Sequence, residues 1–208
     1  MTEVSGEAGA TGAVGLVEAF LARGETVGSA ESLTGGRVCA TLTDVPGASG
    51  AVRGAVVAYA LAVKEQVLGV DPAVLADPGP VSRECAVAMA LGGARVLDTD
   101  WCVSTTGVAG PGPSDGVPAG TVHVAVARRE HVVGHRVLSL HGDRDHVRTA
   151  TVSAALGLLR DCLTRDVSEG DGTVETSGAA TASAPPTGRA RVDAAARPTD
   201  RDARGEEG

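Results

Sequence analysis

Short runs of apolar, β-branched residues alternate with amphipathic helical patterns along this chain, and the alternation limits the folds open to it. The strand patterns lie at 26–30, 51–59, 101–107, 121–129 and 131–140. The helix patterns lie at 13–24, 35–45, 62–70, 82–97 and 143–163, with Ser82 as the expected N-cap of the fourth. Strands that alternate with helices, followed by one hairpin, predict a three-layer α/β/α fold with a mixed, partly parallel sheet.

The two ends of the chain differ in composition from this core. Residues 168–208 contain two Val and no Leu, Met or aromatic residue, so they lack the apolar surface that offsets the entropy of ordering. We therefore expect a disordered N-terminus at 1–12, one folded domain at 13–165 and a disordered tail at 166–208.

The overall charge of the chain disfavours two classes of partner. The formal net charge is −8, and no basic stripe is apparent, which argues against direct binding of nucleic acid or of an anionic membrane. The N-terminus has no signal-peptide pattern and no apolar run is long enough to span a bilayer, so we expect a cytoplasmic protein. A small-molecule substrate or a protein contact is the favoured alternative.

The metal-binding residue types are spaced in a way that does not suggest a metal site. The four cysteines, Cys39, Cys85, Cys102 and Cys162, are widely spaced and form no C-x-x-C pair. Their spacing therefore indicates neither a zinc site nor a disulfide framework. The five histidines fall in the expected hairpin and the helix after it, and His131 and His135 lie on a strand rather than on one helical face. We expect no metal and no cofactor.

One short stretch contains the only tyrosine and the only lysine of the 208 residues, Tyr59 and Lys64. Arginine supplies every other Lys/Arg position, yet its guanidinium cannot lose a proton in a protein, whereas a buried lysine can act as a neutral base. The position that keeps lysine is therefore a candidate general base, and Tyr59 could relay its proton or hold its amine. The alternative is that Lys64 is a solvent-exposed residue of a helix and that Tyr59 only ends a strand, without a role in chemistry.

If the first three strands are parallel neighbours, their carboxyl ends meet at one edge of the sheet, where open α/β folds bind ligands. Ser32 is then the candidate nucleophile, and it needs a base and oxyanion donors nearby. The expected substrate contacts at this edge and at the start of the last helix are Thr34, Gly35, Gly36, Thr106, Gly107, Arg144 and Arg148. The amides of Gly35 and Gly36 are candidates for a phosphate or an oxyanion, and the two arginines for a phosphate; ordinary turn glycines and solvated arginines are the alternatives.

Four segments in order, AESLTGG, Y-x-x-x-x-K, TTGVAGPGPSDGVPAGTV and GDRDHVR, resemble the CinA C-terminal domain family. The resemblance implies a nicotinamide-nucleotide amidase that hydrolyses nicotinamide mononucleotide to nicotinate mononucleotide and ammonia without a metal, in pyridine-nucleotide salvage. It implies Ser32 as nucleophile and Lys64 with Tyr59 as base. This chain departs from the family at Leu33, where a small residue is frequent, and at Ala60-Leu61, where a Ser-Asn pair is frequent.

Two further functions stay open at this stage. The same fold could serve as a catalytically weak regulatory or protein-binding module, since the family name is associated with competence and DNA damage. The Ser32 chemistry could also act on a different amide. A homo-oligomer is possible, because small α/β enzymes often complete a pocket across an interface.

Overall fold

The structure is a computed structural model that describes residues 6–170, with their side chains from 12 to 166. The rest of the two terminal segments expected to be disordered, 1–5 and 171–208, lies outside the described residues. Within the described part, helices extend into both terminal segments. Helix α1 runs over Gly6–Arg23 and helix α6 over Arg144–Gly170, so each is longer than its apolar pattern indicated.

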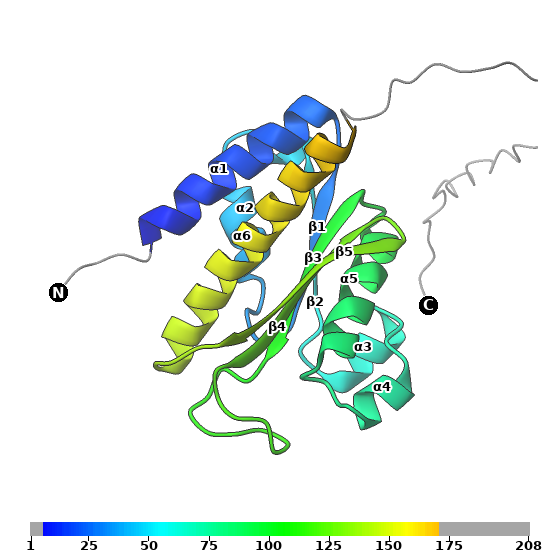
Figure 1. The fold of residues 1–208 in the computed structure, drawn as a ribbon, viewed down its shortest axis with the longest axis vertical. Helices are drawn as coiled ribbons and strands as arrows, with labels where there is room; N and C mark the ends of the chain where they lie inside the picture. The colour runs from blue at the N-terminus through cyan, green and yellow to red at the C-terminus, as the bar shows by residue number, and fades with distance from the viewer. Residues whose placement is uncertain (1–5, 171–208) are drawn as a thin grey trace, which may run out of the picture. The chain divides into compact units, whose positions relative to one another are not determined.

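The sheet confirms the expected mixed topology (Figure 1). Its strands are β1 (Val27–Glu31), β2 (Val52–Val57), β3 (Trp101–Gly107), β4 (Thr121–Arg128) and β5 (His131–Ser139), in the order β2-β1-β3-β4-β5. Strand β1 is parallel to both β2 and β3, while β4 and β5 form the antiparallel hairpin that the sequence predicted. The carboxyl ends of β1, β2 and β3 therefore meet at one edge.

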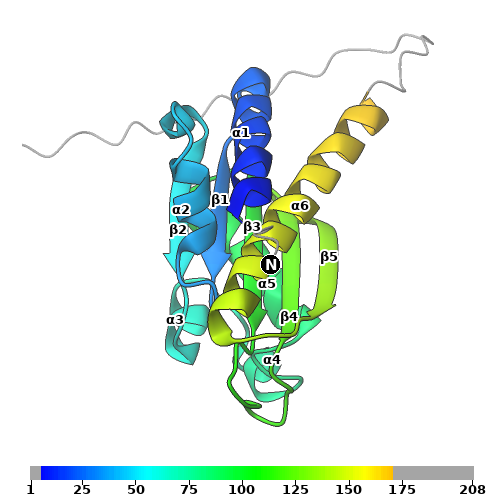
Figure 2. The ribbon, with the colours of Figure 1, turned by 90° about the vertical axis from the view of Figure 1, so that its left-hand side faces the viewer.

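Helices cover both faces of this sheet (Figures 1 and 2). On one face lie α1, α6 and α2 (Arg37–Thr43); on the other lie α3 (Leu61–Gln66), α4 (Pro72–Ala76) and α5 (Arg83–Leu97). Ser82 caps α5 as expected, because its Oγ accepts from the Cys85 amide. Sequence patterns did not indicate α4 or the short 3-10 turn at Ala48–Gly50.

Side chains of the central strand β3 contribute alternately to the hydrophobic cores on the two faces of the sheet. Trp101 and Val103 of β3 belong to the core cluster under α1 and α6, and Cys102 belongs to the cluster under α5. Successive side chains of a strand point to opposite faces, and helices cover both faces of this sheet, so both sides of the strand are shielded from solvent. Strand β3 is accordingly buried from Trp101 to Thr106.

Candidate active site

A pocket of 440 Å³ lies at the carboxyl edge of the three parallel strands. Six of the ten residues predicted for the site line it: Ser32, Tyr59, Lys64, Thr106, Gly107 and Arg144. The loop that follows β3 closes one side from Val108 to Asp115, and Leu33, Leu61, Pro80 and Val81 supply apolar walls. The topology expected from the sequence therefore brings together the nucleophile and base candidates.

Lys64 is a buried residue of this pocket, with 2% of its surface exposed. It lies on α3, and its Nζ donates to Thr106 Oγ1 at 2.9 Å and to Met89 Sδ at 3.6 Å. Among the described residues no carboxylate forms an ion pair with it. Burial lowers the pKa of Lys64, and the nearby Cys85 opposes this only in part. The amine is thus biased toward the neutral form that a base requires.

Ser32 follows β1 directly, and its half-buried side chain lines the pocket. Its amide donates to the Thr105 carbonyl at 2.9 Å, which continues the pairing of β1 with β3 for one residue. The chain then turns through Leu33 and Thr34 into α2. A serine at the end of a central parallel strand is held by the sheet on one side and by the helix start on the other.

Sequence reasoning missed Glu31, the residue that fixes this turn. Its side chain is fully buried and accepts hydrogen bonds from the amides of Gly36, Val38 and Cys39 and from Ser29 Oγ, at 2.8–3.1 Å. An acid just before the first turn of a helix satisfies amides that have no partner within the helix. The adjacency of Glu31 to the T-G-G helix start was the available signal.

The same bonds correct the expectation for the two glycines. Gly36 donates to Glu31, and the Gly35 amide donates to the Ser32 carbonyl at 3.1 Å, so neither amide is presented to the pocket. Both glycines have left-handed φ values, +60° and +92°, which explains why glycine occupies these positions. Thr34 is also outside the pocket lining: it is fully buried and its Oγ1 bonds to Thr105 Oγ1 at 2.7 Å.

The two arginines at the start of α6 have different positions. Arg148 is half-buried and clamps the nucleophile turn, with Nε donating to the Leu33 carbonyl and Nη2 to the Thr34 carbonyl, both at 2.9 Å. Arg144 is exposed and lines the pocket. Both arginines were predicted to bind a phosphate, but only Arg144 lines the cavity. The Arg148 guanidinium instead donates to backbone carbonyls of the turn.

Tyr59 bonds to Arg144 and not to Lys64. Its hydroxyl accepts from Arg144 Nη2 at 2.8 Å, and the second Arg144 nitrogen, Nη1, donates to the Gly110 carbonyl at 3.0 Å. Tyr59 is 63% exposed, so it lies at the mouth of the pocket while Lys64 lies at its base. These contacts do not place Tyr59 as the group that holds the lysine amine.

Comparison with known proteins decides the family. The family model for the CinA C-terminal domain matches residues 10–163 of this chain. The chain belongs to the CinA C-terminal domain family. A CinA-like protein of Frankia casuarinae is 47% identical over 141 residues, which are 68% of this chain and 32% of that protein.

Solved structures agree with this CinA-domain assignment. The competence/damage-inducible protein CihA of Agrobacterium tumefaciens superposes with a TM-score of 0.72 at 34% identity and covers 78% of this chain and 99% of that one. A CinA superfamily protein of Klebsiella pneumoniae superposes with the same TM-score at 30% identity, covering 76% of this chain and 98% of that one. The chain thus spans about a third of the length of the curated relatives and nearly all of the solved domains.

Leu33 and Leu61, two of the three residues at which the sequence was expected to depart from the family pattern, line the pocket of this CinA domain, and the third, Ala60, does not. Leu33 is buried and Leu61 is 50% exposed, and both line the cavity. Leu33 packs in the core cluster under α1 and α6, so of the two it is Leu61 that presents an apolar surface to the cavity.

The cysteine and histidine side chains do not form a metal centre in the described part of the domain. Within residues 12–166, no group of three or more His, Cys, Asp and Glu side chains is arranged to hold a metal ion. All four cysteines are free thiols, and His123 Nδ1 bonds to His135 Nε2 at 3.2 Å across the hairpin.

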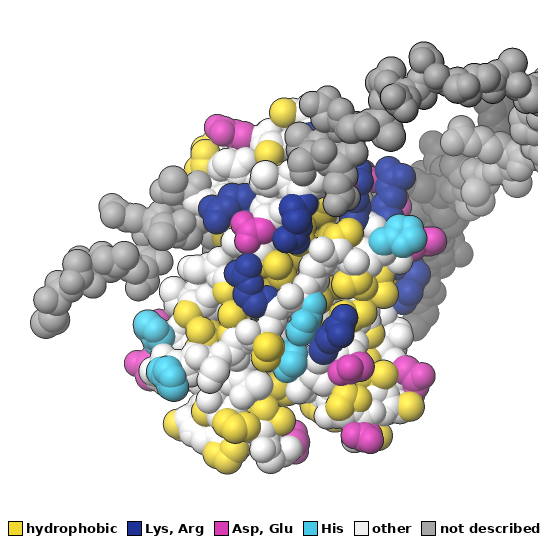
Figure 3. Space-filling view, viewed as in Figure 1, with side chains coloured by type: hydrophobic (Ala, Val, Ile, Leu, Met, Phe, Trp, Pro, Cys, Tyr) yellow, Lys and Arg dark blue, Asp and Glu magenta, His cyan; other side chains and the backbone are white. Residues whose placement is uncertain are grey.

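No helix in the described part of the chain is both long and apolar enough to cross a membrane. Arginines on the face drawn in Figure 3 lie scattered among acidic and apolar side chains.

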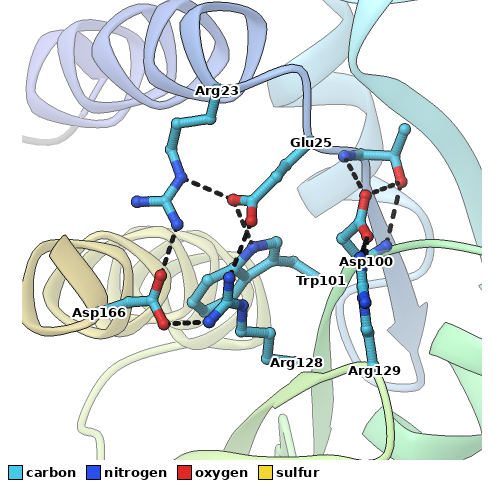
Figure 4. Close-up of polar contacts among 8 residues, drawn as sticks. Arg23, Glu25, Asp100, Trp101, Arg128, Arg129 and Asp166 are labelled. Atoms are coloured by element: carbon cyan, nitrogen blue, oxygen red, sulfur yellow. Dashed lines mark hydrogen bonds and ion pairs between the residues drawn. The ribbon is translucent and has the colours of Figure 1, made fainter. Parts of the chain in front are cut away.

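The opposite edge of the sheet carries a network of charges (Figure 4). Glu25 accepts from Arg23 Nε at 2.6 Å, from Arg128 Nη2 at 3.0 Å and from Trp101 Nε1 at 3.0 Å. Asp166 of α6 pairs with both arginines, and the Arg128 guanidinium stacks over the Trp101 ring at 5.3 Å. Burial opposes ionisation of Glu25, but its three donors together hold its pKa below the usual value.

Proposed function

We propose that this CinA domain is a metal-independent amidohydrolase that converts nicotinamide mononucleotide to nicotinate mononucleotide and ammonia, a reaction of pyridine-nucleotide salvage. The observation that carries the proposal is the single lysine of the chain, buried without a carboxylate partner among the described residues, in the pocket that Ser32 also lines. A neutral amine beside a serine hydroxyl is the combination that activates serine without histidine.

The reaction starts with proton transfer from the Ser32 hydroxyl to the neutral Lys64 amine. The serine oxygen attacks the carboxamide carbon, and the C–O bond forms as the carbonyl electrons move to oxygen. The Lys64 ammonium then returns a proton to the amide nitrogen, the C–N bond breaks and ammonia leaves. Water, deprotonated by the same amine, hydrolyses the acyl-enzyme and regenerates Ser32.

The mouth of the pocket supplies a contact for the charged end of the substrate. Arg144 reaches the cavity from α6, held between Tyr59 and Gly110. Its guanidinium has five N–H donors, so it can bind a phosphate while it keeps both contacts. Since Tyr59 accepts from Arg144, its own hydroxyl proton is free to donate to a substrate atom. Tyr59 then orients substrate and leaves proton abstraction to Lys64.

The apolar walls fit the other end of this substrate. The pyridine ring is flat, and Leu61, Pro80 and Val81 line the cavity that Ser32 also lines. Burial of the ring against these side chains excludes water from the carboxamide, which strengthens the electrostatic interactions at the reacting carbon.

Ammonia release from nicotinamide mononucleotide tests the proposal, with purified wild type, Ser32→Ala and Lys64→Arg proteins compared in the presence of a chelator. We expect turnover by the wild type alone. A parallel assay uses nicotinamide riboside, which lacks the phosphate. Its KM should be higher than that of nicotinamide mononucleotide if Arg144 binds the phosphate. Wild-type protein that releases no ammonia refutes the proposal for this substrate and favours the regulatory or protein-binding module. Turnover by Ser32→Ala contradicts the mechanism.

A further inference from the structure

The hydrogen bonds around Lys64 fix more than its burial. Thr106 Oγ1 donates its proton to the Pro80 carbonyl at 2.6 Å, a carbonyl that can only accept. A hydroxyl has one proton, so toward Lys64 the same oxygen must accept. The bond between Lys64 Nζ and Thr106 Oγ1, 2.9 Å long, therefore has one polarity: the amine donates.

Met89 provides a second acceptor for the same amine. Its thioether sulfur lies 3.6 Å from Lys64 Nζ, and a thioether cannot donate. Met89 is fully buried on α5, with Leu68 and Val70 in the same cluster, so its sulfur is shielded from solvent. The other titratable group near the amine is Cys85, whose thiol burial keeps protonated by raising its pKa.

These two acceptors account for every proton of a neutral lysine. A neutral amine has two N–H groups and one lone pair arranged about a tetrahedral nitrogen. Thr106 takes one N–H and Met89 takes the other, and the remaining position belongs to the lone pair. Lys64 and Ser32 both line the pocket.

We propose that Met89 is a positioning residue, whose sulfur, together with the Pro80-Thr106 hydrogen bond, turns the lone pair of Lys64 toward the pocket. This inference rests on the proposed function, because a directed lone pair matters only if Lys64 is the base. Without the sulfur the amine keeps one anchor and rotates about its Cε–Nζ bond, so the lone pair points at Ser32 for a fraction of the time.

The composition of the chain permits a replacement of this sulfur alone. The sequence contains two methionines, Met1 and Met89, and Met89 is the one within the described residues, so biosynthetic norleucine exchanges sulfur for a methylene at the position in contact with Lys64. Selenomethionine is the conservative control, since selenium is also an acceptor. Met89→Leu repeats the test genetically, and Leu159→Met, in the core cluster on the other face of the sheet, controls for a swap of similar volume.

We expect the selenomethionine protein to match wild type within about twofold and the norleucine protein to lose about tenfold in kcat with KM unchanged, part of the roughly 10²–10⁴-fold that a placed base contributes. The pKa of Lys64, followed by NMR of the single labelled lysine, should fall further in the norleucine protein, because the ammonium loses an acceptor. A lower pKa increases the fraction of Lys64 that is neutral and should by itself raise kcat. A drop in kcat despite this increase therefore reports that the lone pair of Lys64 is no longer directed at the pocket.

A norleucine protein that keeps the wild-type kcat overturns the inference whether or not the pKa of Lys64 changes. If the wild type releases no ammonia, the proposed function fails first, and the NMR comparison still decides whether the contact exists. An unchanged pKa in the norleucine protein then overturns the contact between the sulfur and the amine, and a lowered one supports it.

Discussion

The two edges of the sheet use charge in opposite ways. At the amino edge, where the parallel strands begin, Glu25 and Asp166 each form ion pairs with two arginines. Asp100 pairs with Arg129 and accepts a hydrogen bond from Thr26, so each acid is compensated (Figure 4). At the carboxyl edge, Lys64 is buried with a hydroxyl and a thioether as its partners. An ammonium there lacks the compensation that a carboxylate would give, so the protein loses stability in exchange for a base.

Lys64→Met should give the largest effect and separates the two edges most clearly. We expect activity to fall by at least about 10³-fold, because the base is lost. The melting temperature should rise by a few degrees, since an apolar side chain of similar length replaces one whose protonated form the fold disfavours. Ammonia release and thermal unfolding of the same sample check both. A variant that is inactive and less stable than wild type would contradict the contrast.

Glu25→Gln makes the reverse change at the amino edge. We expect a loss of about 1.5–3 kcal/mol in the free energy of unfolding, the usual magnitude for hydrogen bonds to a charged group, with kcat within twofold of wild type. Urea unfolding at pH 7 measures the loss. A kcat that fell in proportion to stability would show that the two edges are coupled.

The pH dependence of this variant sharpens the comparison. Because the folded-state pKa of Glu25 lies below its unfolded value, its stabilisation is present above about pH 4.3 and is lost as pH falls through the folded-state pKa. The difference in stability between wild type and Glu25→Gln should therefore be constant from pH 7 to about pH 5 and shrink below that. A difference that stays the same down to pH 2.5 would rule out the ionised carboxylate as its source.

Arg144→Gln should give the smallest effect. The variant keeps a hydrogen-bonding amide but loses the charge, so we expect KM for nicotinamide mononucleotide to rise about tenfold with kcat little changed. Arg129→Gln, in the ion pair at the amino edge, is the matched control and should leave KM unaltered. Equal effects of both substitutions would mean that overall charge, and not the pocket contact, sets KM.

Much of this architecture follows from local patterns. Short apolar, β-branched runs predicted β3 and the hairpin, and the parallel arrangement of β1, β2 and β3 placed Ser32, Lys64 and Thr106 at one edge. Compositional scarcity singled out Lys64, because a lysine in an arginine-rich chain marks a need that arginine cannot meet.

What the sequence did not predict depends on partners brought together by the fold. The one local signal for Glu31 is its place just before the T-G-G helix start, and its role appears only when the amides of α2 point back at it. The separation of Arg144 from Arg148 has the same origin: four residues apart on one helix, one meets the carbonyls of the Ser32 turn and the other meets Tyr59. Helix ends also exceeded their apolar patterns, since helical hydrogen bonds continue into polar residues.

Titration of the only lysine tests the central claim most directly. Protein labelled with carbon-13 lysine gives signals from one side chain in the whole chain, and their chemical shift against pH reports the pKa of Lys64. We predict a pKa below the ordinary value of about 10.4, because burial penalises the ammonium and no carboxylate of the described residues compensates it. A pKa at or above that value in the folded protein would contradict the account, since Lys64 would then be protonated at neutral pH and unable to accept the proton of Ser32.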